Sequence, residues 1–357
     1  MKLFIPGPTQ VSPEILAEMA KPAIGHRTTE CARLWRESRD GLQKLMHTKN
    51  EVMILTAPAS AFMEAAIRNT VKTKSLHLVC GAFSKRWFDI AKSTGVDAIA
   101  VEKKTGQGFS ADDLRSALNE CGTVDAVTVV HNETSTGVTN PVQDYAEVLK
   151  DFPDTLLLVD TVSSMSGMPV YVDKWGIAVC LFGVQKCMAL PAGVAVASAS
   201  PRALERAATI EYRGWFLDFL RLAKSNEKEQ SPTTPSTAHL YALTAQLKRI
   251  FSEGVEARWK RHYEMAAYVR NWAKNHGYEM FPDDGYCSDT VSCIARGTGP
   301  DFVPVLNALK EEGILVSNGY GDLKGKTFRI GHLGEHNLDD IRQLTEQFDA
   351  MLEPAFA

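Results

Sequence analysis

The sequence lacks the long apolar runs that mark membrane proteins. No stretch reaches the roughly 18 apolar residues that a membrane-spanning helix needs. The apolar run before Pro6 is too short for the hydrophobic region of a secretion signal. We therefore expect a cytoplasmic protein that does not interact with a membrane.

Cysteine pairs, strong positive charge and dinucleotide-binding glycines are also missing. The seven cysteines are scattered and form no CxxC pair, so we expect reduced core thiols and no metal. The formal net charge is −4, with no basic cluster on one expected face, so nucleic acid is not an expected partner. No GxGxxG follows the first expected strand, which excludes the dinucleotide-binding fingerprint.

What the sequence does contain is a regular alternation of strand and helix patterns from about residue 50. Its apolar, β-branched runs predict strands at 52–57, 75–81, 97–102, 126–132, 155–161, 176–183 and 193–200. These runs are apolar nearly throughout, as in strands covered by helices on both faces. The fold class is therefore α/β, with a mostly parallel, doubly wound sheet of about seven strands.

A second, smaller unit follows this sheet. A chain of 357 residues exceeds the size of one ordinary hydrophobic core, so two domains are expected. A long helical pattern covers 235–275 and breaks near Gly254, and a short α+β pattern follows it. We expect an N-terminal arm over 1–15, a large domain over 16–258 and a small C-terminal α+β domain over 259–357.

Polar residues gather where the expected parallel strands end, which is the edge where such sheets bind ligands. Asp160 ends a buried strand, and Lys186 lies in the apolar stretch LFGVQKCMAL beside Gln185. The segments after three other strands contribute Ser60, Phe83 and Thr134. This edge therefore offers a helix N-terminus, an aromatic ring, a hydroxyl, a carboxylate and an amine.

Each of these residues also has an ordinary structural explanation. Ser60 is explained as a helix N-cap, Phe83 as a core residue and Thr134 as part of a turn. Lys186 is explained as a loop residue whose methylenes cover apolar surface. Asp160 is harder to explain in this way, because a carboxylate that ends a buried strand needs a partner. A single site for pyridoxal phosphate explains all of them together.

The sequence resembles the class V aminotransferases of pyridoxal-phosphate fold type I, near the alanine:glyoxylate and serine:pyruvate group. The resemblance runs nearly end to end. Its motifs are PGPT (6–9), MEAA (63–66), ETSTGV (133–138), VDTVSS (159–164), GVQK (183–186), TTPST (233–237), LYAL (240–243), GVEARW (254–259) and FRIGHLG (328–334). The acid, the QK pair and the RIG arginine, in this order, are its most specific features.

The resemblance implies a role for each residue at this edge. Lys186 is expected to bind the cofactor aldehyde as a Schiff base and to carry the proton between substrate and cofactor. Asp160 is expected to pair with the ring nitrogen and Phe83 to stack on the ring. The other cofactor contacts that it implies are Ser60 with its neighbours Ala59 and Ala61 at the phosphate, and Thr134 and Gln185 at the ring oxygen.

The resemblance also implies substrate contacts and a shared site. Arg329 is expected to bind the substrate carboxylate as a bidentate fork, with Gly7 nearby. Thr234, or Thr233 in a neighbouring register, matches a position that holds the phosphate from the partner subunit, so a homodimer is expected. One departure is the loop Ala57-Pro58-Ala59, where many relatives have glycines. Pro58 has no N–H, so one phosphate contact is replaced or absent.

Three functional hypotheses follow. The first is a ping-pong transaminase that moves an amino group from L-alanine or L-serine to glyoxylate or pyruvate. The second is another class V enzyme: a phosphoserine aminotransferase, which needs further cations at the site, or a cysteine desulfurase, which Gln185 in place of a histidine disfavours. The third is a catalytically silent structural homologue, which the presence of both Lys186 and Asp160 disfavours.

Overall fold

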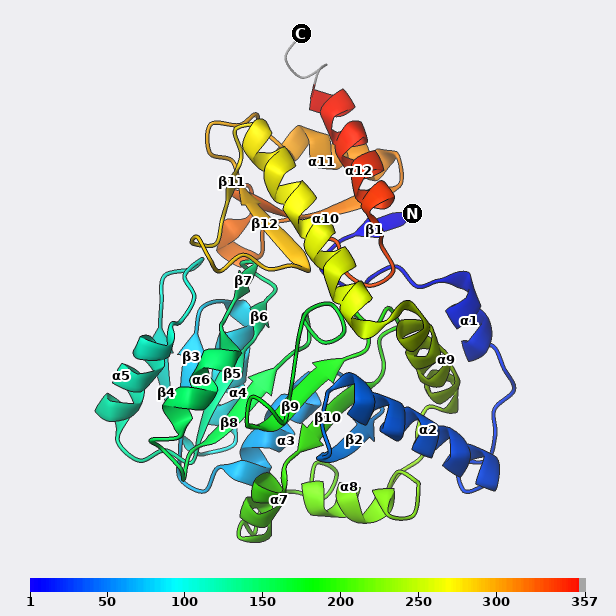
Figure 1. Cartoon of the computed structure of the whole chain (residues 1–357), viewed down its shortest axis with the longest axis vertical. Helices are drawn as coiled ribbons and strands as arrows, with labels where there is room; N and C mark the ends of the chain where they lie inside the picture. The colour runs from blue at the N-terminus through cyan, green and yellow to red at the C-terminus, as the bar shows by residue number, and fades with distance from the viewer. Residues whose placement is uncertain (353–357) are drawn as a thin grey trace.

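Seven strands form the larger sheet of the computed structural model, which describes residues 1–352 (Figure 1). β10 runs antiparallel to its neighbours β2 and β9, and the remaining strands pair in parallel. The predicted mostly parallel, seven-stranded sheet is therefore confirmed. In spatial order the strands are β2 (Glu51–Leu55), β10 (Ala195–Ala199), β9 (Ile177–Gly183), β8 (Leu156–Asp160), β5 (Ala126–Val130), β3 (Lys74–Val79) and β4 (Asp97–Glu102).

Successive side chains of each strand point into two different cores, because strands present their residues with a period of two. Val127 and Val129 lie in one core, whereas the adjacent Ala126 faces the other. Helices cover both faces, which explains why the strand sequences are apolar throughout. One core is covered by α1 (Pro13–Met19), α2 (Thr29–Leu45), α5 (Ala111–Cys121), α6 (Val142–Leu149) and α9 (Thr237–Glu253). The other is covered by α3 (Ser60–Thr70), α4 (Ala82–Ser93), α7 (Pro201–Ala208) and α8 (Phe219–Asn226).

A second sheet of five strands forms the smaller unit, drawn at the top of Figure 1. Its first strand comes from the N-terminal segment, because β1 pairs in parallel with β13. The strands, in order, are β1 (Lys2–Phe4), β13 (Ile314–Asn318), β14 (Thr327–Gly331), β12 (Val291–Ala295) and β11 (Glu279–Met280). Its helices are α11 (Val303–Glu311), α12 (Leu338–Leu352) and the 3₁₀ turn η1 (Gly321–Leu323). A short hairpin of β6 (Asn132–Glu133) and β7 (Val138–Thr139) completes the strands of the described chain.

The helix α10 (Val255–Asn275) joins the two units. The predicted break at Gly254 is confirmed, since this residue has φ +90° and separates α9 from α10. Trp259 lies in the large core, whereas Met265, Val269, Trp272 and Ala273 lie in the small core. We propose the domain boundary near residue 258, in the first turn of α10. The last five residues of the expected 259–357 domain lie outside the described residues.

Candidate active site

The predicted site residues lie at the carboxyl ends of the parallel strands. Asp160 is the last residue of β8, Lys186 follows β9, and Ser60 opens the helix after β2. They line a cavity of about 130 Å³, far more than the ~10–15 Å³ that one water requires. Its walls are Pro58, Ala59, Ser60, Met63, Phe83, Arg86, Val130, Asn132, Thr134, Asp160, Val162, Gln185 and Lys186.

Lys186 is buried, with 9% of its surface exposed. Burial lowers the pKa of its amine to about 8, and the charge of Arg329 acts in the same direction. The Lys186 Nζ donates a hydrogen bond to the carbonyl of Pro6 and lies 6.0 Å from the centroid of the Phe83 ring. Gly7 has φ +126°, and a Cβ there would lie 2.5 Å from Lys186 Cδ. Glycine is therefore required at position 7 for the N-terminal segment to pass over the lysine.

Asp160 is buried and has few partners. Its Oδ1 accepts the backbone N–H of Val162 at 2.7 Å, and no other residue of the described chain donates to the carboxylate. Burial raises the pKa of Asp160 to about 7, and the nearby Glu133 adds to this rise. The carboxylate can therefore accept a further hydrogen bond from a cationic N–H donor in the cavity, and such a donor would favour its charged form.

Phe83 is held in place by a carboxylate that the sequence reasoning did not assign. Glu133 is fully buried and accepts the backbone N–H groups of Phe83 and Ser84 at 3.1 and 2.9 Å, which caps the N-terminus of α4. Gly81 allows this approach, since a Cβ there would lie 2.5 Å from Glu133 Cγ. Glu133 is the first residue of the ETSTGV motif, so the motif was the sequence feature that pointed to this residue.

Thr134 contacts residues of both the larger and the smaller unit at the cavity wall. Its hydroxyl lies 2.5 Å from that of Ser163, a partner that the sequence reasoning also missed. Its carbonyl accepts a hydrogen bond from Arg329 Nη1 at 3.2 Å. Gln185 lines the same cavity, and its carbonyl accepts the N–H of Thr9 at 3.1 Å.

The N-terminus of α3 presents free backbone donors to the cavity. Within the described residues, the N–H groups of Ala59 and Ser60 donate to no acceptor. Such donors at the start of an 11-residue helix favour an anion. The N–H of Ala61 is not available, because it donates to the carbonyl of Pro58 at 2.9 Å. Ala61 also does not line the cavity.

Arg329 comes from β14 of the small domain and is 8% exposed. Its guanidinium donates to the carbonyls of Thr134 and Asn318, and no carboxylate of residues 1–352 forms an ion pair with it. It lies 5.5 Å from the ring of Tyr320, which in turn lies 5.7 Å from the Phe83 ring. A buried guanidinium that contacts only carbonyls favours an anionic ligand.

Thr233 and Thr234 do not line this cavity. Thr234 is exposed, and the segment is anchored where the N–H of Ser236 donates to Thr56 at 2.9 Å. Five further residues line the cavity that the sequence reasoning did not assign to the site: Met63, Arg86, Val130, Asn132 and Val162. Arg86 lies 4.8 Å from the Phe83 ring and forms no ion pair in the described chain.

These residues fit pyridoxal phosphate, which carries a phosphate, a ring nitrogen, a phenolic oxygen and an aldehyde. The free N–H groups at Ala59 and Ser60 suit the phosphate, and the incompletely bonded carboxylate of Asp160 suits a protonated ring nitrogen. The buried amine of Lys186 suits the aldehyde. Fold and site together define a pyridoxal-phosphate enzyme of fold type I.

Comparisons with known proteins identify the family. The model of the family described as "Aminotransferase class-V" matches residues 3–322. The chain is 39% identical to an uncharacterized aminotransferase of Methanocaldococcus jannaschii, over 93% of this chain and 87% of the relative. It is 32% identical to the soluble hydrogenase small subunit of a Synechococcus species, over 98% of this chain and 92% of the relative.

A solved structure agrees with these relatives. The crystal structure of an alanine–glyoxylate aminotransferase from a Nostoc species has a TM-score of 0.91 at 30% identity, covering 98% of this chain and 94% of that one. The resemblance inferred from the sequence is confirmed. The chain belongs to the class V aminotransferase family, whose members depend on pyridoxal phosphate.

Proposed function

We propose that this chain transfers an amino group from a small L-amino acid, alanine or serine, to glyoxylate or pyruvate by a ping-pong mechanism. The observation that carries this proposal is the pairing of two buried cations across the domain boundary. Lys186 lies on the large domain, and Arg329 reaches the same cavity wall from the small domain. The name of the Nostoc structure, an alanine–glyoxylate aminotransferase, supports the substrate pair.

Arg329 would hold the α-carboxylate that donor and acceptor share. Two parallel N–H···O contacts would fix the orientation of the substrate and place its Cα toward Lys186. The guanidinium is already held by two backbone carbonyls, so little side-chain entropy remains to be lost on binding. Donor and acceptor would occupy this position in turn, which is the basis of the ping-pong order.

Lys186 would move a proton at the substrate Cα. Its lowered pKa leaves a substantial neutral fraction of the amine near neutral pH, as a general base requires. When bound, the cofactor supplies an aldehyde that accepts the amino group and a ring that withdraws electrons from Cα. Asp160 would hold the ring nitrogen protonated, Phe83 would pack on the ring face, and Thr134 and Gln185 would contact its oxygen side.

The phosphate would be held by Ser60 and Ala59, and by Thr234 of a second copy of this chain. Two observations support the second copy. Pro58 supplies no N–H to the phosphate loop, and Thr234 is exposed rather than packed into the cavity of its own chain. The homodimer is part of this proposal. Sedimentation of the protein with and without the cofactor would measure its oligomeric state.

One observation favours a second candidate, an enzyme for an amino acid with an anionic side chain such as phosphoserine. Arg86 lines the cavity, forms no ion pair with any residue of 1–352, and supplies the kind of extra cation that this alternative requires. The variant Arg86→Gln separates the two candidates. It should leave turnover of L-alanine or L-serine nearly unchanged, whereas an enzyme for anionic side chains should lose affinity for L-phosphoserine or L-aspartate.

The decisive experiment is an absorbance spectrum of the purified protein with pyridoxal phosphate, before and after L-alanine, L-serine, L-aspartate or L-phosphoserine is added singly. A yellow band that one small donor bleaches would support the proposal and identify half of the reaction. A band that only an anionic donor bleaches would favour the second candidate. Absence of any band would point to a structural homologue, in line with the name of the Synechococcus relative.

A further inference from the structure

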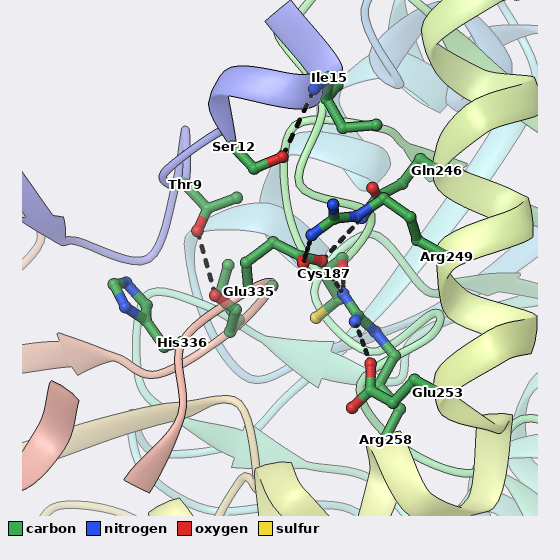
Figure 2. Close-up of polar contacts among 12 residues, drawn as sticks. Thr9, Ser12, Ile15, Cys187, Gln246, Arg249, Glu253, Arg258, Glu335 and His336 are labelled. Atoms are coloured by element: carbon green, nitrogen blue, oxygen red, sulfur yellow. Dashed lines mark hydrogen bonds and ion pairs between the residues drawn. The ribbon is translucent and has the colours of Figure 1, made fainter. Parts of the chain in front are cut away.

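A buried arginine outside the cavity connects the two halves of the site. Arg258 lies in the first turn of α10, and only 1% of its side chain is exposed. Its Nη1 donates to Glu253 Oε2 at 2.7 Å, and its Nη2 donates to Glu335 Oε1 at 3.0 Å. Arg258, Glu253 and Glu335 are called the Arg258 cluster below (Figure 2).

The Arg258 cluster contacts the backbone next to the candidate catalytic lysine. Arg258 Nη2 also donates to the carbonyl of Cys187 at 2.8 Å. Cys187 directly follows Lys186 and is itself fully buried. The guanidinium therefore fixes the orientation of the peptide that follows Lys186. Figure 2 shows Cys187 and Glu335 meeting at the same arginine from separate segments.

Glu335 belongs to the loop that continues from β14, the strand that carries Arg329. The same face of α10 holds this loop at two further points. His262 Nε2 accepts the N–H of Gly334 at 3.1 Å, and Arg261 donates to the carbonyls of Gly334 and His336. The segment after the substrate arginine is thus attached to the helix that also fixes the lysine loop.

Each carboxylate of the Arg258 cluster is paired with a second arginine besides Arg258, Arg261 at Glu253 and Arg249 at Glu335. Burial opposes ionisation of Glu335, but Arg258 together with hydrogen bonds from Gln246 and Arg249 outweighs it and lowers the pKa of Glu335 to about 2. Glu335 is therefore charged throughout the neutral range. A pH effect seen near neutrality after a change in this cluster would report on the cavity and not on Glu335.

We propose that Arg258 is a positioning residue that holds the Lys186 loop and the β14 loop in one register. It sets the placement of the Lys186 amine relative to the Arg329 guanidinium without touching substrate or cofactor. This inference rests on the proposed roles of Lys186 and Arg329. It assigns a function to the arginine of the GVEARW motif that those roles leave unexplained.

The test compares Arg258→Lys with the wild-type holoenzyme. Lysine keeps the charge but cannot contact Glu253, Glu335 and the Cys187 carbonyl together, because it lacks the planar fork. We expect kcat to fall about tenfold to a hundredfold, as small misplacements of catalytic groups do. We also expect KM for the amino donor to rise and the pH midpoint of the cofactor absorbance to move.

The matched control is Arg249→Gln. Arg249 contacts Glu335 Oε2 at 3.1 Å, but 43% of its side chain is exposed and it does not contact Cys187. The control therefore removes a cation from the same carboxylate at the rim. Its kcat, KM and absorbance midpoint should stay close to wild type. Thermal unfolding of both variants, with and without pyridoxal phosphate, checks that each is folded.

If Arg258→Lys fails to fold, the variant Glu335→Gln tests the positioning role instead. This variant keeps Arg258 and the shape of its partner but removes the charge that ties the β14 loop to it, and it should raise KM more than Arg249→Gln does. A folded Arg258→Lys with wild-type absorbance midpoint, kcat and KM would overturn the proposal. So would equal effects of Glu335→Gln and Arg249→Gln.

The absorbance titration needs only the cofactor, so it separates the two levels of inference. If Lys186→Ala leaves the wild-type absorbance band in place, the proposed function has failed. If Lys186→Ala abolishes that band while Arg258→Lys changes nothing, only the positioning role has failed.

Discussion

Asp160 and Lys186 are buried with one hydrogen-bond partner each, whereas each carboxylate of the Arg258 cluster is held by more than one donor. The consequence appears in their pKa values. Burial raises the pKa of Asp160 to about 7 and lowers that of Lys186 to about 8, while the pKa of Glu335 falls to about 2. Buried charged groups with a single partner change protonation near neutral pH, whereas the carboxylates of the Arg258 cluster, held by several donors, stay charged and have a structural role.

The largest expected effect on turnover comes from removing the amine of Lys186. Lys186→Ala should reduce turnover by about 10³-fold or more, since general acid–base catalysis alone contributes ~10²–10⁴-fold. Steady-state kinetics with L-alanine and glyoxylate would measure it, with thermal unfolding as a check on folding. Lys150→Ala, in an exposed pair with Glu147, is the matched control and should be silent. Substantial residual turnover would show that Lys186 is not the catalytic base.

The next largest effect on turnover is expected at Asp160. Asp160→Asn keeps the shape but not the charge, and turnover should fall by about 10²-fold, as loss of one preorganised electrostatic group does. The cofactor-free protein gives a second readout. Because the folded-state pKa of Asp160 is about 7, above the ordinary value of about 3.9, the carboxyl lowers stability as pH rises from about 4 to 7.

The asparagine variant lacks this penalty. Cofactor-free Asp160→Asn should therefore unfold at a higher temperature than wild type at pH 8, and the difference should shrink toward pH 4. At ~1.36 kcal/mol per pKa unit, the gain at pH 8 is at most about 4 kcal/mol. A difference that stays constant between pH 4 and pH 8 would contradict the raised pKa.

A smaller effect is expected at Arg329, the residue proposed to bind the substrate carboxylate. Arg329→Lys keeps the charge but loses the bidentate fork, so KM for the amino donor should rise about tenfold to a hundredfold with a weaker effect on kcat. That range corresponds to ~1.5–3 kcal/mol for a hydrogen bond to a charged group. Arg342→Lys, at an exposed pair with Asp339, is the control. An unchanged KM would show that another residue holds the carboxylate.

The smallest effect should come from Arg249, at the exposed edge of the Arg258 cluster. Arg249→Gln breaks a partly exposed contact with Glu335, so the free energy of unfolding should fall by about 1 kcal/mol or less. Urea unfolding would measure it, and the loss should diminish at high salt. A loss of several kcal/mol would mean that the rim cation is essential to the Arg258 cluster.

The large sheet was predictable because strands buried on both faces are apolar throughout, and because parallel strands place their carboxyl ends at one edge. The same rule places Asp160 and Lys186 together, since Asp160 lies at the end of one predicted strand and Lys186 follows the next. The family resemblance adds Arg329, which lies far from Asp160 and Lys186 in the sequence and could not be placed near them from strand patterns alone. The break at Gly254 was readable as a glycine within a helical pattern.

The remainder depends on contacts between residues far apart in sequence. The pairing of β1 with β13 could not be read from a three-residue apolar run. Glu133 stands in the ETSTGV motif, but its role could not be assigned from the sequence, because that role arises only where Glu133 meets the N-terminus of α4. Arg258 has the sequence environment of a solvated helix arginine, and only packing shows that it is buried.

The position of β1 also sets an order of assembly. Lys2 pairs with Ile314, so the small sheet cannot close until nearly the whole chain has left the ribosome, whereas the large sheet can form earlier. The stretch that follows β1 carries Pro6, whose carbonyl binds Lys186, and Gly7, which packs on it. Cleavage of this stretch by a protease would therefore release the contacts of Pro6 and Gly7 with Lys186 even though the large sheet stayed folded.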